Sequence, residues 1–366
     1  MKTDLIARLY DDPGPFASAY VEVSRDQEDG DRVAELQARR AADELTGQGA
    51  PEEVVALVAE RLATSAHQSA PVSRCVVASA RGVLLDELTP RHRAQPTASW
   101  GPLPDLAGWI ADADTAVPFV LALVDHEGGE VSRYAADAVA VEEETTAGGR
   151  TEFEHKIRGG GWSHLRYQHH VENVWRRNAA DVVIEIDRQA RGQVGLVVLA
   201  GDPRSRQQVR ALLPDLDVQV VELEAGGRNA DGGRQALEEA VEGVLRETVV
   251  QTKLAQVHEL RDRMGRDHAV AVGVDDVAGA FVRGQVDRLL IDPAAAAGFT
   301  VEPARHPGLT FGAVTDLPSS VPADQALVAA AVVTGAEVLV AHSGTLGGAP
   351  AAALLRWDQP ARGTDA

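Results

Sequence analysis

The sequence has little cysteine, few aromatic residues and no long apolar run. Its single cysteine, Cys75, cannot form a disulfide within the chain, and the apolar run 75–77 around it predicts a buried thiol in a reducing compartment. No segment approaches the roughly 18 uncharged apolar residues of a membrane-spanning helix. Residues 1–15 carry early acids and lack the apolar core of a signal peptide. We therefore expect a cytoplasmic protein that makes no membrane contact.

Positive charge is also scarce. The 366 residues include 35 Lys and Arg against 55 Asp and Glu, which gives a formal net charge of -20. Such a surface repels a polyanion, so the composition argues against a general nucleic-acid binder and against DNA as a partner. A local contact with RNA remains compatible with this charge.

Length and patterning indicate an α/β protein of several domains. A chain of 366 residues exceeds one ordinary domain, and an apolar fraction of 45% is enough to build folded cores. We predict three domains, which cover residues 1–114, 115–245 and 246–366.

Periodic apolar positions predict helices and strands along the whole chain. The predicted helices cover 31–45, 51–62, 106–110, 162–189, 203–213, 235–264, 274–283 and 324–334. The predicted strands cover 16–24, 73–80, 82–88, 117–124, 130–134, 138–141, 193–200, 218–223, 286–291, 309–314 and 337–341. Residues 89–104 are rich in proline and are predicted to form a loop. The acidic and then Thr- and Gly-rich residues 142–150 are predicted to be a mobile connection.

Two segments contain residue types used in catalysis, but neither pattern predicts an enzyme. Asp125 follows a predicted strand as a nuclease carboxylate would, yet no companion acids stand at corresponding strand ends, so a turn is favoured. The run His342-Ser343-Gly344 lacks a nucleophile elbow and a paired acid, and we interpret it as a loop. The sequence indicates no metal site and no cofactor.

One basic and aromatic segment contrasts with the acidic background. Three glycines, Gly159 to Gly161, precede a helix-like run that begins at Trp162. Between residues 150 and 177 the chain has six Lys or Arg and three acids. Glycine adopts backbone conformations closed to other residues and lets the chain approach another surface closely. The segment is a candidate RNA contact, although a flexible connector followed by a solvated helix face would have the same composition.

The order of residues in this segment favours the functional interpretation. Residues 160–167 read Gly-Gly-Trp-Ser-His-Leu-Arg-Tyr, which resembles the Gly-Gly-Gln-Ser-Ala-Leu-Arg-Phe loop of the archaeo-eukaryotic release factor 1 and Pelota superfamily. Two later motifs resemble the third domain of that superfamily: Gly-Gln-Val-Asp-Arg-Leu-Leu-Ile at 284–291, and Gly-Gly followed by Ala-Leu-Leu-Arg-Trp between 347 and 357. The pattern is similar to the bacterial branch, which includes members proposed as ribosome-hibernation factors.

This resemblance implies a fold, a partner and a binding site. It implies an RNase H-like central domain with the loop at 158–163, and an L7Ae/L30e-like C-terminal domain. The N-terminal domain departs from the family, with neither an Asn-Ile-Lys-Ser motif nor an evident Pelota-like RNA-binding barrel. The implied partner is the 70S ribosome, through ribosomal RNA and P-site tRNA, with elongation factor Tu as a neighbour. The residues expected to contact RNA are Arg158, Gly159, Gly160, Gly161, Trp162, Ser163, Arg166, Arg176 and Arg177.

The family's glutamine is replaced by Trp162. In release factors that glutamine positions water for hydrolysis in the peptidyl-transferase centre, whereas the indole of Trp162 offers one N–H donor and a ring that can stack on a base. We therefore expect a non-catalytic factor that occupies the ribosomal A site during stress or dormancy. Two alternatives stay open: a peptidyl-tRNA hydrolase in which Gln168 or a histidine replaces the glutamine, and an interaction protein that retains only the fold.

Overall fold

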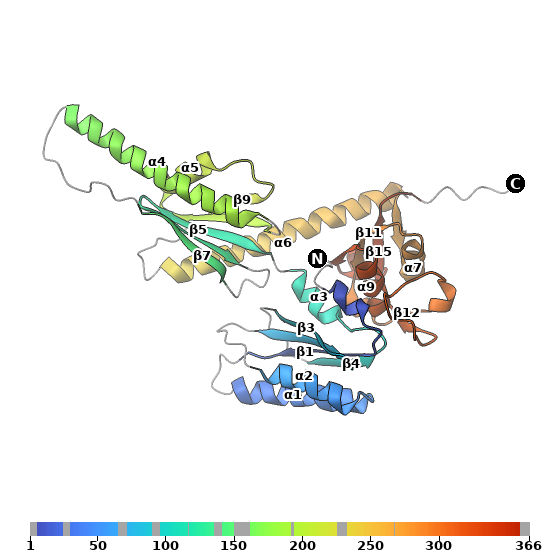
Figure 1. Ribbon diagram of the computed structural model, residues 1–366. Coiled ribbons are helices and arrows are strands. Elements are labelled where there is room, and N and C mark those ends of the chain that lie inside the picture. Colours follow the sequence, from blue (N-terminus) through green and yellow to red (C-terminus); the bar gives the residue numbers. More distant parts are fainter. Residues whose placement is uncertain are drawn as a thin grey trace. The chain divides into compact units, whose positions relative to one another are not determined.

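The computed structural model describes residues 6–24, 30–64, 72–89, 96–115, 117–134, 141–149, 162–191, 194–224, 233–266 and 268–358. Contact density divides the chain into two compact units (Figure 1). Residues 1–115 and 251–366 form one, called here the terminal unit, and residues 116–250 form the central unit. The predicted division into three domains at residues 114 and 245 stays a prediction.

The N-terminal part of the terminal unit is an antiparallel sheet covered by two helices. The strands lie in the order β3-β2-β1-β4. Their bounds are Phe16–Glu22 (β1), Ser73–Ser79 (β2), Gly82–Thr89 (β3) and Thr97–Gly101 (β4). The helices α1 (Gly30–Gly47) and α2 (Glu52–Ala63) pack on one face, and a 3₁₀ helix, η2 (Ala7–Asp11), and α3 (Ala107–Ala113) complete this part.

Strand β1 is buried on both faces. Ala17, Ala19 and Val21 contact the core under α1 and α2, whereas Phe16 and Tyr20 belong to the core on the opposite face. Both faces therefore favour apolar side chains, which explains why β1 has a nearly continuous buried pattern.

The prediction of a loop at 89–104 is wrong, because β4 lies inside that segment. β4 pairs with the edge of β1, with Ala98 opposite Ala19. Pro96 and Pro102 stand just outside the strand, where the missing N–H breaks no hydrogen bond of the ladder. Cys75 is buried in β2, as predicted.

The C-terminal part of the terminal unit has a mixed sheet in the order β10-β15-β11-β14. The strands are β10 (Val270–Val272), β11 (Val286–Ile291), β14 (Glu337–Val340) and β15 (Ala351–Leu355), with a small ladder of β12 (Thr300–Val301) and β13 (Val321–Pro322). The helices are α7 (Val274–Val282), α8 (Pro293–Ala296) and α9 (Ala323–Val333), with 3₁₀ turns η3 (Pro303–Arg305) and η4 (Ser343–Thr345).

The predicted strand at 309–314 is also wrong, since these residues form irregular backbone with a turn at 312–313. Gly312 has φ +70°, and a Cβ there would lie 2.2 Å from the carbonyl oxygen of Tyr10. The amide of Ala313 donates to that same oxygen at 2.8 Å. The segment is therefore bonded to η2 and not to a neighbouring strand.

The central unit is an α/β sandwich around a five-stranded sheet in the order β7-β6-β5-β8-β9. The strands β5, β8 and β9 are parallel, whereas β5, β6 and β7 form an antiparallel meander. Their bounds are Phe119–Asp125 (β5), Gly128–Tyr134 (β6), Val141–Gly148 (β7), Leu196–Gly201 (β8) and Gln219–Glu222 (β9). This topology confirms the α/β class and the RNase H-like order expected for this region.

Three helices cover the central sheet. Helices α4 (Trp162–Ala190) and α5 (Pro203–Leu212) lie over one face, as Figure 1 shows, and the first turns of α6 (Gly233–Arg266) bury Leu237 and Val241 on the other. The segment 142–150, predicted to be mobile, instead supplies most of the edge strand β7. Of the predicted strand at 138–141, residues 138–140 lie outside the described residues.

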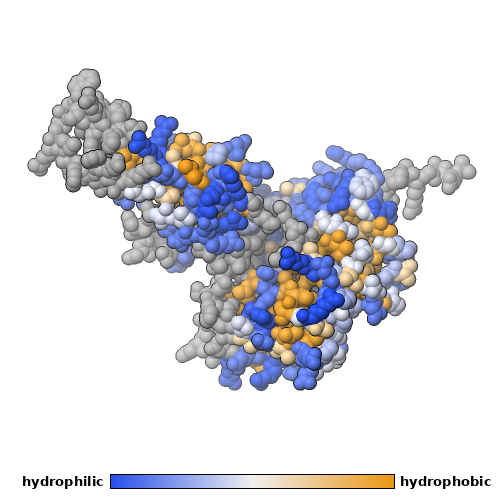
Figure 2. Space-filling view, in the orientation of Figure 1, coloured by the Kyte–Doolittle hydropathy of each residue, from blue (hydrophilic) through white to orange (hydrophobic). Residues whose placement is uncertain are grey.

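No helix among the described residues is long and apolar enough to cross a bilayer, and no group of three His, Cys, Asp or Glu among them is placed to hold a metal ion. Hydrophilic residues cover much of the described surface on the face drawn in Figure 2, with smaller apolar patches between them.

Candidate nucleic-acid interface

The predicted RNA-binding residues fall in three groups in the structure. Arg158 to Gly161 lie outside the described residues. Trp162, Ser163 and Arg166 belong to the first turns of α4 by their backbone, and nothing more is described of their side chains. The side chains of Arg176 and Arg177 are exposed on the same helix. At about 1.5 Å per residue, Arg176 lies roughly 21 Å along the axis from Trp162.

Helix α4 has one buried face and one exposed face. Val174, Asn178, Val182 and Ile186 recur every four residues and face the sheet, which is the spacing of an amphipathic helix. Within the part of the chain that the structure describes, no acid pairs with Arg176 or Arg177. An exposed guanidinium group of this kind can contact a phosphate of a ligand.

The strand that enters the loop, β7, is tightly packed at its end. A Cβ on Gly128, which has φ +146°, would lie 2.2 Å from the carbonyl oxygen of Ala147. A Cβ on Gly148, at φ +94°, would lie 2.7 Å from the Cα of Gly128. The amide of Gly149 donates to the carbonyl of Glu127 at 2.6 Å. Only glycine fits this crossing, which fixes the chain where it leaves for the loop.

The turn beneath that crossing is held by Asp125. Its Oδ1 accepts hydrogen bonds from the amides of Glu127 at 2.8 Å and Gly128 at 3.0 Å. Asn178 of α4 donates to the carbonyl of His126 at 3.4 Å. The interpretation of Asp125 as a turn residue is confirmed, and the turn is tied to the helix that follows the loop.

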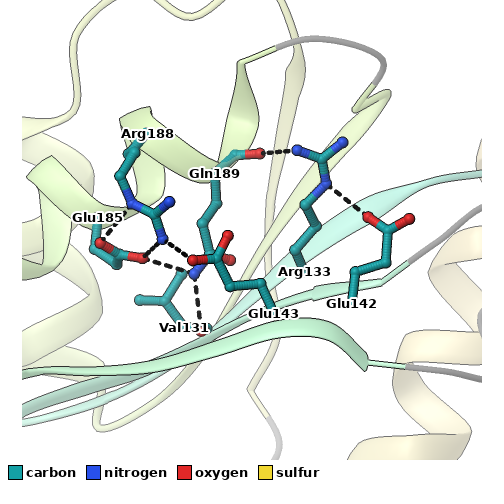
Figure 3. Close-up of polar contacts among 7 residues, drawn as sticks. All are labelled: Val131, Arg133, Glu142, Glu143, Glu185, Arg188 and Gln189. Atoms are coloured by element: carbon teal, nitrogen blue, oxygen red, sulfur yellow. Dashed lines mark hydrogen bonds and ion pairs between the residues drawn. The ribbon is translucent and has the colours of Figure 1, made fainter.

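A second set of polar contacts ties β7 to the C-terminal half of α4 (Figure 3). Arg188 donates to Glu185 at 3.1 Å and also pairs with Glu143 of β7. Buried Gln189 donates to Glu185 at 2.7 Å and to the carbonyl of Val131 at 3.2 Å. The Arg188 hydrogen bond holds the pKa of Glu185 below its usual value, although partial burial opposes this. The acidic character of β7 is thus compensated by a partner from α4.

Arg133 of β6 completes this set. Its Nε lies 2.9 Å from an oxygen of Glu142, and its Nη1 donates to the carbonyl of Gln189 at 3.4 Å. Polar contacts therefore hold α4 to the β5–β6 turn near Asn178 and to β7 near Arg188.

Sequence reasoning missed these positioning residues. Asn178 and Gln189 are polar residues on the apolar seam of α4, eleven residues apart, which is close to three helical turns. A polar side chain on a buried seam indicates a specific hydrogen bond. That spacing was the signal available in the sequence.

The segment His342-Ser343-Gly344 has the acid partner that the sequence reasoning did not find. The amide of Ser343 donates to Asp292 at 2.8 Å, and the other oxygen of Asp292 accepts from the amide of Ala295 at 3.1 Å. Burial works to raise the pKa of Asp292, but these hydrogen bonds outweigh it and lower the pKa. The carboxylate caps α8 and braces the following turn, which is a structural arrangement.

Comparison of the sequence with known proteins relates this region to a protein family. Residues 118–266 match the model of the bacterial archaeo-eukaryotic release factor family 2. The uncharacterized protein Rv2629 of Mycobacterium tuberculosis is 26% identical over 307 residues, which are 80% of this chain and 78% of that protein.

Two solved structures of translation-related factors align with much of this chain at low sequence identity. Dom34 of S. cerevisiae, a translation termination-like factor, aligns with 79% of this chain and 80% of its own at 9% identity and a TM-score of 0.41. A ribosome-bound archaeal Pelota aligns with 98% of this chain and 94% of its own at 16% identity and a TM-score of 0.39.

The matched region contains β5 to β9, α4 and α6, so it includes the loop and both elements that support it. Residues 118–266 are therefore similar to the bacterial branch of the release factor 1 and Pelota superfamily.

Proposed function

We propose that this protein is a non-catalytic ribosome-binding factor whose Gly-Gly-Trp loop enters the region of the peptidyl-transferase centre. The observation that carries the proposal is Trp162 in a release-factor-related region, at the position of the family's glutamine. An indole has no carbonyl oxygen with which to hold a water molecule, whereas its ring can stack on a base or a ribose. The loop would then block the centre without releasing a peptide.

Charge supports RNA as the ligand of this region. The net charge of -20 disfavours contact over the whole surface, but residues 150–177 have an excess of Lys and Arg. Arg176 and Arg177 are exposed and unpaired in the described part of α4. The ribosomal A site, next to P-site tRNA, is the place that the family relation favours, with elongation factor Tu as a possible neighbour and stress or dormancy as the occasion.

The enzymatic alternative is a peptidyl-tRNA hydrolase of the ribosome-rescue class. Its replacement for glutamine would be Gln168 or a neighbouring histidine. Because α4 begins at Trp162, Gln168 lies within the helix, roughly 9 Å along the axis from its start. That position disfavours Gln168 as a group at the tip of the loop. The third alternative, an interaction protein that retained the fold, predicts no affinity for ribosomes.

Sedimentation with purified 70S ribosomes at physiological salt tests the proposal. The wild type should pellet with ribosomes, and Trp162→Ala and Arg166→Ala should each weaken the binding. A peptide-release assay on ribosomes loaded with peptidyl-tRNA should then show no release above background. Release by the wild type would favour the hydrolase, and absence of binding, with and without elongation factor Tu, would favour the interaction protein.

A further inference from the structure

Three elements of the central unit meet at the carboxyl ends of its parallel strands β5 and β8. The amide of Asp202, which precedes α5, donates to the carbonyl of Val124 in β5 at 2.9 Å. Two residues further along, His126 occupies the β5–β6 turn, and α4 reaches this turn through Asn178. In open α/β sheets, ligands bind where the carboxyl ends of the strands meet the following loops.

Two rings come together at this edge. The imidazole of His126 and the indole of Trp175 have centroids 6.1 Å apart in an edge-on arrangement. The side chain of His126 is 53% exposed, and Trp175 is half-buried on α4. Aromatic residues are only 4% of the chain, so two partly exposed rings in contact are a notable feature of this edge.

Unpaired cations stand on both helices at this edge. Arg176 follows Trp175 on α4, and Arg204 is exposed in the first turn of α5; neither pairs with an acid among the described residues. Asp202 is committed to the amide and hydroxyl of Ser205, both at 2.9 Å. Hydrogen bonds from Ser205 hold the pKa of Asp202 below its usual value, and a charged His126 would act in the same direction.

Among the described residues, Glu127 is an acid close to the imidazole of this ring pair. An oxygen of Glu127 lies 3.9 Å from Nε2 of His126. Its carboxylate would oppose a phosphate but not a base that stacks on Trp175. Stacking is tolerant of sequence because every base presents a π-face.

We propose that Trp175, His126 and the flanking Arg176 and Arg204 form a second RNA contact, in which an unstacked base packs on Trp175 and arginines meet the adjoining phosphates. This contact lies roughly 20 Å along α4 from Trp162, so it is separate from the tip of the loop. It rests on the proposed function, because it needs an RNA partner. It adds to that function a point that fixes the orientation of the central unit on RNA.

The test is 70S sedimentation at several salt concentrations with a matched series at one position. Trp175→Ala should weaken binding about tenfold, whereas Trp175→Phe, which keeps a stacking ring, should lose less than about threefold. His126→Ala and Arg204→Ala should each weaken binding, and Glu127→Gln should strengthen it about twofold. Trp357→Ala, which removes an exposed ring of the terminal unit, is the control and should bind as the wild type does.

Each outcome decides the inference. If Trp175→Ala binds normally while Trp162→Ala and Arg166→Ala bind weakly, the second contact is wrong and the proposed function stands. If Trp175→Ala and Trp175→Phe both bind weakly and both lower the thermal midpoint of the protein, the ring has a structural role and the inference is also wrong. If the wild type does not bind ribosomes at all, the proposed function and this inference fail together.

Discussion

Helices α4 and α9 use apolar residues in opposite ways. Nine of the eleven residues of α9 are buried, so this helix lies inside the core of the terminal unit. Helix α4 buries one seam against the central sheet and leaves side chains such as Ile184, 67% exposed, on its other side. A helix that is apolar all round stabilises a fold, whereas a long amphipathic helix also presents a surface. The Gly-Gly-Trp segment stands at the start of α4, which is the amphipathic helix of the two.

The largest effect should come from the buried seam of α4. Ile186→Ala should lower the free energy of unfolding by about 2–5 kcal/mol, because it leaves a cavity against the sheet. Ile184→Ala, two residues earlier on the exposed side, should change it by no more than about 0.5 kcal/mol. Chemical denaturation of both variants measures the difference. Equal losses of stability in the two variants would mean that Ile186 is not buried and Ile184 exposed in the way described.

Two carboxyl groups, one on α4 and one on α9, differ in their partners and in their burial. Glu185 of α4 has Arg188 and Gln189 as partners. Asp324, near the start of α9, is 4% exposed, and its Oδ1 has no hydrogen-bond partner among the residues that the structure describes. Burial, and then the charge of Asp105, raises the pKa of Asp324 to about 6.

The raised pKa of Asp324 predicts a dependence of stability on pH. The folded protein binds this proton more tightly than the unfolded chain, in which the pKa of the carboxyl group is 3.8. The contribution of Asp324 to stability is therefore fully present below pH 3.8 and is lost as pH rises through about 6. At pH 7, Asp324→Asn should therefore raise the free energy of unfolding, by as much as about 3 kcal/mol. Thermal unfolding from pH 4 to pH 7 measures it. A variant with the wild-type pH dependence would show that another group is responsible.

The contacts between β7 and α4 should have a smaller effect on stability. Gln189→Leu removes the donor to Glu185 and to the carbonyl of Val131, and should cost about 1–2 kcal/mol. Part of this cost is offset because Oε1 of Gln189 accepts no hydrogen bond within the described part of the chain. Hydrogen exchange should become faster in β7.

An exposed ion pair on the same helix provides the control for Gln189→Leu. Arg191→Ala breaks a pair with Asp187, and the Arg191 side chain is 77% exposed. It should change stability by less than about 1 kcal/mol and leave exchange in β7 unchanged. If Gln189→Leu behaves in the same way, the polar contacts do not fasten β7.

Local patterns predicted most elements because helical and strand periodicity are local properties. Helices α1, α4 and α6, and the strands around Val120, Val197 and Leu289, were predicted from this periodicity. β4 was missed because its pairing with β1 joins residues far apart in sequence, between prolines that indicate a loop. β7 was missed because its acids are neutralised by Arg133 and Arg188, which come from other elements.

For the candidate site, too, local features were predicted from the sequence and contacts between distant residues were not. The sequence order Gly-Gly-Trp-Ser predicted the family, since that information lies within eight residues. The support beneath the loop was not predicted. It depends on the crossing of Gly128 and Gly148 and on the burial of Asn178, which bring together residues from before and after the loop.

The smallest effect on stability, and a clear effect on binding, is expected on the exposed face of α4. The double variant Arg176→Ala, Arg177→Ala should leave the thermal midpoint unchanged, because neither side chain pairs with an acid in the described part of the chain. It should weaken ribosome binding, and it should reduce the slope of log affinity against log salt by about 1 to 2, since each lost phosphate contact contributes about 0.7–0.9. Arg191→Ala, on the same helix, removes an arginine already paired with Asp187 and should keep the wild-type slope. Equal slopes in all three proteins would show that α4 contributes packing to the fold but no phosphate contact, and the difference between α4 and α9 would then have no consequence for RNA.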